Sequence, residues 1–323
     1  RDTTEGLAQT SDPTTNDSWP MFGHDLQNTR ASSSPAPHSP NLLWTFKGPF
    51  QGWGASPVVS DGRVFVGAES ANEFYCLNET NGALLWVFRT KGTITNSAAV
   101  SAGRVLVGTG NGGLYCLNEK TGMPIWNVTL DEQIYESSPA VADGRVFVGG
   151  WAYDSYGSHL YCLNLSDGNV LWKYQVYQAV CSSPAVLDGR VFVGGTGPGA
   201  GQVYCINETT GDNIWTYTTR DHVGRSSPAV VNNRVFIGSL DHHVYCLDAK
   251  DGKQIWKYLV SSWTDSSPAV AYGNVFTASE DGNVYCLNAT SGTKIWTYEA
   301  ITQVTSSPSV ADGMVFIGSS KFD

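Results

Sequence analysis

The chain has 323 residues, of which 12% are aromatic and 35 are glycine, a composition that favours many short strands and tight turns over helices. Its formal net charge of −10 argues against nucleic acid or an anionic membrane as the main partner, because both are polyanions. No apolar run approaches the length of a membrane-spanning helix, so we do not expect the chain to span a membrane.

Residues 1–18 are polar and have the composition of a disordered tether, whereas residues 19–323 are expected to form a single domain. The start at Arg1, without an initiator Met, is typical of a chain whose leader has been removed. Together with six N-x-S/T sequons it predicts an exported glycoprotein, extracellular or at the cell surface. Four sequons share one repeat position, so copying of an ancestral unit could also explain them. The predicted glycosylation positions are Asn16, Asn78, Asn127, Asn164, Asn207 and Asn288.

From residue 41 onward the chain repeats itself, with a Trp every 40–46 residues. A period of this length is typical of four-stranded propeller blades. We therefore predict an all-β fold, a seven-bladed β-propeller of four-stranded antiparallel blades. A single blade buries too little surface to be stable, so each repeated indole is expected to fill the gap to the next blade. These structural tryptophans are Trp44, Trp86, Trp126, Trp172, Trp215, Trp256 and Trp296.

Each repeat contains four short runs with strand character, separated by turn residues. In residues 137–141 (SSPAV), Pro139 cannot donate to a ladder, so this run is expected at the edge that lines the central channel. Residues 144–149 (GRVFVG) are continuously apolar, as in a strand covered on both faces. The third and fourth runs, YCLN (161–164) and LWKY (171–174), are predicted to form a hairpin around an Asn-to-Gly turn.

Six of the seven cysteines occupy one repeat position, from Cys76 to Cys286. Identical positions in neighbouring blades lie about 10 Å apart, beyond the ~7 Å that a disulfide allows between Cα atoms. We therefore interpret them as small buried apolar residues. Cys181 is the exception, because it precedes an inner strand near the channel mouth and could be reactive. The chain has no C-x-x-C pair, so no zinc site is indicated.

The inner strand occurs seven times, from Ser56-Pro57 to Ser307-Pro308, but the YCLN run occurs only six times. The first outer strand, NLLWTF (41–46), precedes every inner strand, so we predict that it closes the ring by joining the C-terminal strands in a composite blade. That blade lacks its third strand. Two explanations stay open: the sequence stops short of this strand, or residues 1–18 or a neighbouring chain fill the gap.

The repeat C-x-N-x-x-[TDNS]-G-x-x-x-W resembles the tryptophan-docking motif A-x-D-x-x-T-G-x-x-x-W of PQQ-type (quinoprotein) propeller repeats. The Cys-to-Trp interval is ten residues in all six copies, and the resemblance covers about residues 19–320. The opening WPMFGHDLQNTR (19–30) is similar to the start of the non-dehydrogenase members. Cys replaces the motif's Ala, and Asn replaces its Asp except at Asp248; both changes are compatible with the fold.

The resemblance implies the fold but not the function, because the family includes PQQ-dependent dehydrogenases and a scaffold of the outer-membrane assembly machine. The alcohol dehydrogenases carry eight blades, a vicinal Cys-Cys disulfide against the quinone, a Ca²⁺ site and a catalytic Asp. This chain has no Cys-Cys dipeptide and no carboxylate cluster with the spacing of a hard-cation site. We therefore expect no catalytic residues, no metal and no cofactor.

Binding residues are expected at the channel mouth, where otherwise identical repeats differ. The residues before the inner strands, and the loops that lead to them, form an aromatic rim of mixed charge that suits a glycan or a protein segment. The insertion 149–159 adds aromatics on the same face if it joins the second and third strands. The alternative is that these loops are simply variable and solvated. The predicted binding residues are Trp53, Tyr135, Glu136, Tyr177, Arg225, Trp263 and Asp265.

The sequence thus favours a non-catalytic surface module that acts in binding or structure, with self-assembly by strand addition to the incomplete blade as one form of it. A PQQ-dependent dehydrogenase and a scaffold of an envelope complex are the alternatives.

Overall fold

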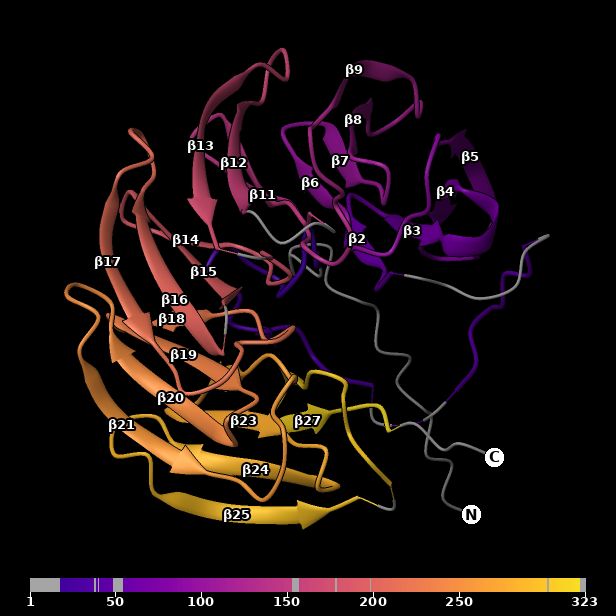
Figure 1. Ribbon diagram of the computed structural model, residues 1–323. Coiled ribbons are helices and arrows are strands. Elements are labelled where there is room, and N and C mark those ends of the chain that lie inside the picture. Colours follow the sequence, from indigo (N-terminus) through magenta and orange to yellow (C-terminus); the bar gives the residue numbers. More distant parts are fainter. Residues whose placement is uncertain are drawn as a thin grey trace, which may run out of the picture.

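The computed structural model describes residues 18–37, 39, 41–48, 55–152, 157–177, 179–197, 199–300 and 302–319. They form seven β-sheets around a common axis, and in Figure 1 the chain passes from sheet to sheet around the ring, from indigo to yellow. The predicted seven-bladed propeller, including its composite blade, is confirmed. The predicted tether apart from Ser18, the sequon Asn16 and the rim residue Trp53 lie outside the described residues.

Six sheets have four antiparallel strands that follow one another in chain order from the channel outward. The first three are β2 (Val58–Ser60), β3 (Arg63–Ala68), β4 (Glu73–Asn78) and β5 (Leu84–Arg89); β6 (Ala99–Ser101), β7 (Arg104–Gly108), β8 (Gly113–Asn118) and β9 (Pro124–Thr129); and β10 (Ala140–Ala142), β11 (Arg145–Gly149), β12 (Ser158–Asn164) and β13 (Val170–Val176). The next three are β14 (Ala185–Leu187), β15 (Arg190–Gly197), β16 (Ala200–Asn207) and β17 (Asn213–Thr218); β18 (Ala229–Val231), β19 (Arg234–Ser239), β20 (His243–Asp248) and β21 (Gln254–Leu259); and β22 (Ala269–Ala271), β23 (Asn274–Ala278), β24 (Asn283–Asn288) and β25 (Lys294–Glu299).

The seventh sheet contains three strands among the described residues, β1 (Ala31–Ser32), β26 (Ser309–Ala311) and β27 (Met314–Phe316). The one helix described is the 3₁₀ turn η1 (Glu69–Ala71). No helix in the described part of the chain has the length and apolar character needed to cross a bilayer.

The SSP motif of the inner strands explains how each blade is tied to itself and to its neighbour. The first Ser fixes its own blade, as where Ser182 Oγ accepts the Gly194 N–H at 2.7 Å. The second Ser links blades, as where the Ser138 N–H donates to Ser183 Oγ at 3.0 Å. The second link recurs from Ser97 through Ser307, so a belt of serines surrounds the channel.

Six of the seven repeated tryptophans lie against the turn glycine of the next blade. Gly168 adopts φ +76°, and a Cβ built on it would lie 2.7 Å from Trp126 Cε3. The Trp126 indole N–H donates to the Leu165 carbonyl of the same turn at 2.9 Å. The same hydrogen bond is made by Trp44, Trp86, Trp172, Trp215 and Trp256. Trp296 makes none within the described residues and is 38% exposed.

The composite blade differs from the prediction in its N-terminal strand. The strand that is hydrogen-bonded is β1, which pairs in parallel with β26 at the channel edge (Ala31 with Val310). Residues 41–46 are extended but join no sheet, and they pack on the first blade through Trp44 and Phe46. In the complete blades the third strand connects the second strand to the fourth. The described seventh sheet contains neither such a third strand nor residues 41–46.

Candidate ligand-binding channel

Residues 19–32, which we call the plug, run across the central channel and touch the inner strands in turn. Along the plug, the carbonyls of Trp19, Pro20, Leu26, Gln27, Thr29 and Arg30 accept the N–H groups of Val59, Val100, Val186, Val230, Val270 and Val310. These valines belong to six different sheets. The opening motif that resembles other family members therefore supplies one hydrogen-bond acceptor to each of six blades.

Local backbone geometry shows how tightly the plug is held. Asn28 is buried, and its Nδ2 lies 3.1–3.3 Å from the carbonyls of Ser183, Pro184 and Pro228. His24, Asn28 and Arg30 all have positive φ, at 77°, 54° and 53°. Such angles are uncommon in residues other than glycine, and they persist where the surroundings over-determine the backbone.

The channel mouth is a cavity of about 470 Å³ lined by the third to sixth blades and by Trp151 of the insertion. The insertion joins β11 to β12, as the sequence suggested. The rings of Tyr135 and Trp151 lie 5.6 Å apart between centroids, and Trp263 is 50% exposed at the same opening. Five of the seven predicted binding residues line this cavity: Tyr135, Glu136, Arg225, Trp263 and Asp265.

Tyr177 does not line the cavity, and its side chain is 57% exposed elsewhere. It follows β13 directly, whereas the cavity residues Glu136, Cys181, Arg225 and Asp265 immediately precede the inner-strand motifs. Position relative to the inner strand therefore decides which variable residues reach the mouth.

Arg225 links two of the carboxylates at the mouth, one through its guanidinium and one through its backbone. Arg225 Nε lies 2.9 Å from Glu136 Oε1, and the Arg225 backbone N–H donates to Asp265 Oδ1 at 3.2 Å. Burial raises the pKa of the Glu136 carboxyl, and the Arg225 guanidinium opposes that rise. Burial, with the Glu136 carboxylate beside it, raises the pKa of the Cys181 thiol to about 12. At neutral pH Cys181 is therefore a thiol and not the thiolate that a reactive cysteine requires.

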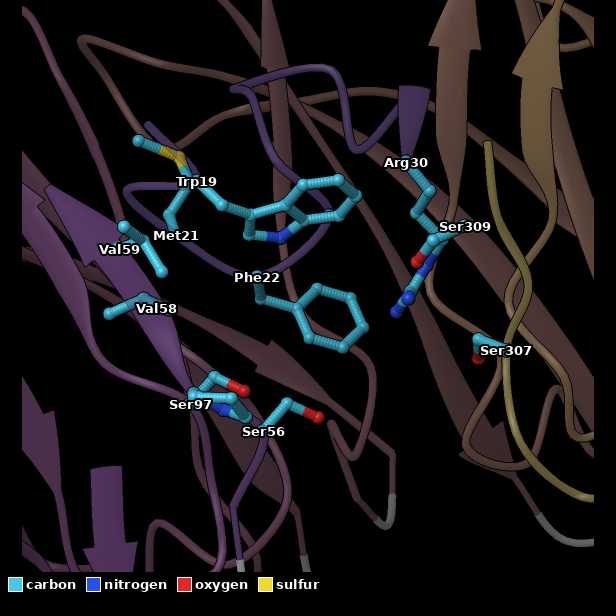
Figure 2. A pocket seen from close by; sticks show the side chains of 12 residues that line it. Trp19, Met21, Phe22, Arg30, Ser56, Val58, Val59, Ser97, Ser307 and Ser309 are labelled. Atoms are coloured by element: carbon cyan, nitrogen blue, oxygen red, sulfur yellow. The ribbon is translucent and has the colours of Figure 1, made fainter. Parts of the chain in front are cut away.

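The channel floor includes plug residues that the sequence pattern does not mark as binding residues. A cavity of about 340 Å³ shares Glu136, Cys181, Arg225 and Asp265 with the mouth, and its other lining residues include Phe22, Arg30 and several belt serines. A further cavity of about 370 Å³ lies on the Trp19 side. Figure 2 shows the Arg30 side chain directed into the space between Phe22 and Ser307. The signal for this floor was the 19–30 motif, but nothing in its pattern indicated that it enters the channel.

Comparison with known proteins places the chain in a family. The model of the family described as outer membrane protein assembly factor BamB matches residues 33–100, 75–154, 139–221 and 199–322. The chain belongs to this family. The BamB of Yersinia pestis is 24% identical over 212 residues, 64% of this chain and 44% of that protein. The tetrathionate hydrolase of Acidithiobacillus ferrooxidans is 25% identical over 217 residues, 59% of this chain and 41% of that protein.

A quinohemoprotein alcohol dehydrogenase of Pseudomonas putida is 28% identical over 142 residues, 38% of this chain and 19% of that protein. The chain thus spans less than half the length of these curated relatives. Among solved structures, BamB of Moraxella catarrhalis superposes with a TM-score of 0.72 at 18% identity, over 86% of this chain and 83% of that one. A europium-containing methanol dehydrogenase gives 0.65 at 12% identity, over 90% and 87%. At these identities the structural likeness establishes the fold alone.

Proposed function

We propose that this chain is a non-catalytic binding module, extracellular or at the cell surface, whose channel mouth holds a segment of a partner protein. The observation that supports this is the pairing of exposed aromatic rings, Tyr135 and Trp263, with the compensated charges of Glu136 and Arg225 at one open cavity. Aromatic residues and Arg are enriched at protein interfaces and dominate their binding energy. The names of the BamB relatives, which describe assembly of outer membrane proteins, agree with a protein partner.

A quinone-dependent dehydrogenase is the enzymatic alternative, and the channel residues do not fit its cofactor. Within the part of the chain that the structure describes, no three His, Cys, Asp or Glu side chains converge as metal ligands would. Three carboxylates line the channel mouth, Glu136, Asp265 and Glu280, and the first two are engaged by Arg225. Calcium needs six to eight oxygen ligands, so this arrangement offers no hard-cation site beside a quinone.

The test compares the wild type with Trp263→Ala and with a matched control, Tyr298→Ala. Tyr298 is an exposed aromatic on β25, outside the channel lining. The proteins are immobilised and exposed to a detergent extract of the source cell's envelope. A partner at the mouth should be retained by the wild type and by Tyr298→Ala, and lost with Trp263→Ala. Equal retention by all three contradicts the proposal, as does alcohol oxidation in a dye-linked assay with added PQQ and Ca²⁺.

A glycan is the second candidate ligand, because stacked aromatic rings such as Tyr135 and Trp151 suit the apolar face of a sugar. Titration of the wild type and Trp263→Ala with envelope polysaccharide fragments separates the two ligand classes. If a polysaccharide fragment binds saturably to the wild type but not to Trp263→Ala, the ligand of the mouth is a glycan and not a protein segment.

Self-association is proposed as a further property of the module. In the described seventh sheet, β27 forms an edge, and its Phe316 is 41% exposed. Exposed strand edges accept additional strands. A peptide with the sequence of residues 283–290, which carries a third strand and its turn, should then dissociate oligomers seen by light scattering. A monomer at every concentration contradicts self-association but leaves the mouth proposal standing.

A further inference from the structure

Arg30 carries a buried charge that nothing in the described structure neutralises. Its side chain lies in the channel floor, and the residue is 8% exposed. Its guanidinium carbon stands 4.2 Å from the centroid of the Phe22 ring, so the aromatic contact covers one face of the group. No carboxylate or carbonyl of the described residues pairs with its N–H groups, and its Nε is buried without an acceptor. Buried charges in proteins are normally paired, and an unpaired one indicates a missing partner.

The floor around Arg30 is rich in hydrogen-bond donors. The cavity of about 340 Å³ is also lined by Ser56, Ser183, Ser227, Ser267 and Ser307. In the last four, Oγ already accepts a backbone N–H from the preceding blade at 2.9–3.0 Å. Their hydroxyl hydrogens have no acceptor among the described residues and stay free to donate into the cavity. A ligand here meets a guanidinium and a set of hydroxyl donors.

The carboxylates nearest the floor do not fill this role. Glu136 and Asp265 line the mouth end of the same cavity and are both engaged by Arg225. Burial alone lowers the pKa of Arg30 to about 10, with no contribution from any carboxylate. The group therefore stays protonated at neutral pH, and its positive charge remains available to a ligand that enters through the mouth.

We propose that the channel floor binds a small tetrahedral oxyanion of the sulfate or phosphate class, held by the Arg30 guanidinium and the hydroxyl groups of the belt serines. Such an anion presents acceptors in every direction, which matches a lining of donors around one uncompensated positive charge. The site lies on the plug, below the aromatic rim, so the proposal of an anion here does not depend on the partner proposed for the mouth.

The test is calorimetric titration of the full chain with sodium sulfate and with sodium phosphate, in sodium chloride buffers of constant ionic strength. We expect one saturable site for at least one of these anions. Arg30→Met should abolish the binding, whereas Arg220→Met, which removes an exposed arginine outside the channel lining, should leave it unchanged. Sulfate also stabilises folded proteins in general, so only binding that differs between these variants counts as support.

Arg30 belongs to the plug, so its substitution could prevent folding; Ser56→Ala provides a second variant. Ser56 lines the floor cavity and holds no blade-linking hydrogen bond within the described residues. Loss of one hydroxyl donor should weaken the anion about two- to tenfold. The proposal is overturned if neither anion shows saturable binding, or if binding is unchanged in Ser56→Ala and in a folded Arg30→Met. Saturation by acetate or by a peptide carboxylate, but by neither inorganic anion, also overturns it.

Discussion

The contact between each turn glycine and the indole of the preceding blade can be measured with a pair of matched substitutions in the third blade. Gly168 and Gly144 have nearly the same backbone, with φ of +76° and +72°. A Cβ on Gly168 would lie 2.7 Å from Trp126 Cε3, whereas a Cβ on Gly144 would meet nothing within 4 Å. Alanine in the left-handed region costs about 1–2 kcal/mol, partly offset by about 0.4–1 kcal/mol from the unfolded chain. Both contributions to the free energy of unfolding, the backbone cost and the offset from the unfolded chain, are the same for the two substitutions.

Gly168→Ala alone also forces atoms into the Trp126 ring, and such overpacking costs about 1–3 kcal/mol. We therefore expect its free energy of unfolding, from urea titration, to fall about 1–3 kcal/mol further than that of Gly144→Ala. In a Trp126→Ala background the two substitutions should become equivalent, because the indole that creates the clash is gone. Equal losses in the wild-type background would refute the idea that the indole fixes the spacing between blades.

Three other predictions follow from the same geometry. Burial raises the pKa of the repeated thiols to about 11 at Cys116 and Cys286 and to about 12 at the other four, from about 9 when unfolded. Because the thiol pKa is higher in the folded protein than in the unfolded chain, rising pH favours the unfolded chain, whose thiols ionise first. The free energy of unfolding is therefore unaffected by these thiols below about pH 9 and decreases as the pH rises towards 11–12. The melting temperature should fall as the pH rises from about 9 to about 11, and less so in Cys246→Ala. Asn127 is exposed on β9, whereas the Oδ1 of Asn78 accepts the N–H groups of Thr80 and Asn81 in its turn. We therefore expect the Asn127 sequon to be glycosylated more fully than the Asn78 sequon, which peptide mapping of protein from a glycosylating host can measure. Asn28→Ala removes three hydrogen bonds that hold the plug, so it should lower the free energy of unfolding by about 2–4 kcal/mol in urea titration.

Most of the fold could be predicted because the same pattern of strands and turns occurs in six copies of the repeat. Pro139 marks the channel edge, the Cys162 run marks the third strand, and the Cys-to-Trp interval fixes the hairpin register, with a bulge after each cysteine. The composite blade was harder, because residues 31–32 carry no strand pattern of their own and pair only where β26 is already in place. The pattern therefore predicts the N-terminal strand at residues 41–46, which share the outer-strand pattern, whereas the strand that the described sheet contains is β1.

The mouth was partly predictable, because four of the residues that directly precede an inner-strand motif line it: Glu136, Cys181, Arg225 and Asp265. Tyr177 is predicted at the mouth as an aromatic residue of a loop that leads to an inner strand, but it does not line the cavity. The floor was not predictable, since it is made by a non-repeated segment whose contacts lie up to 280 residues away along the chain, as between Arg30 and Val310. Periodicity gives no information on where such a segment lies.

The plug and the serine belt suggest why this propeller tolerates a seventh sheet with only three described strands. Ring closure at the outer edge depends on a third strand that joins β27 to residues 41–46, and within the described residues that connection is missing. Closure at the inner edge is continuous, because the Ser267 N–H reaches Ser307 Oγ and the Val310 N–H reaches the Arg30 carbonyl. The last blade is therefore fastened at the channel by hydrogen bonds within the described residues. Those bonds hold the inner strands that line the proposed ligand site, so the channel can be rigid whatever covers the outer edge of the seventh blade.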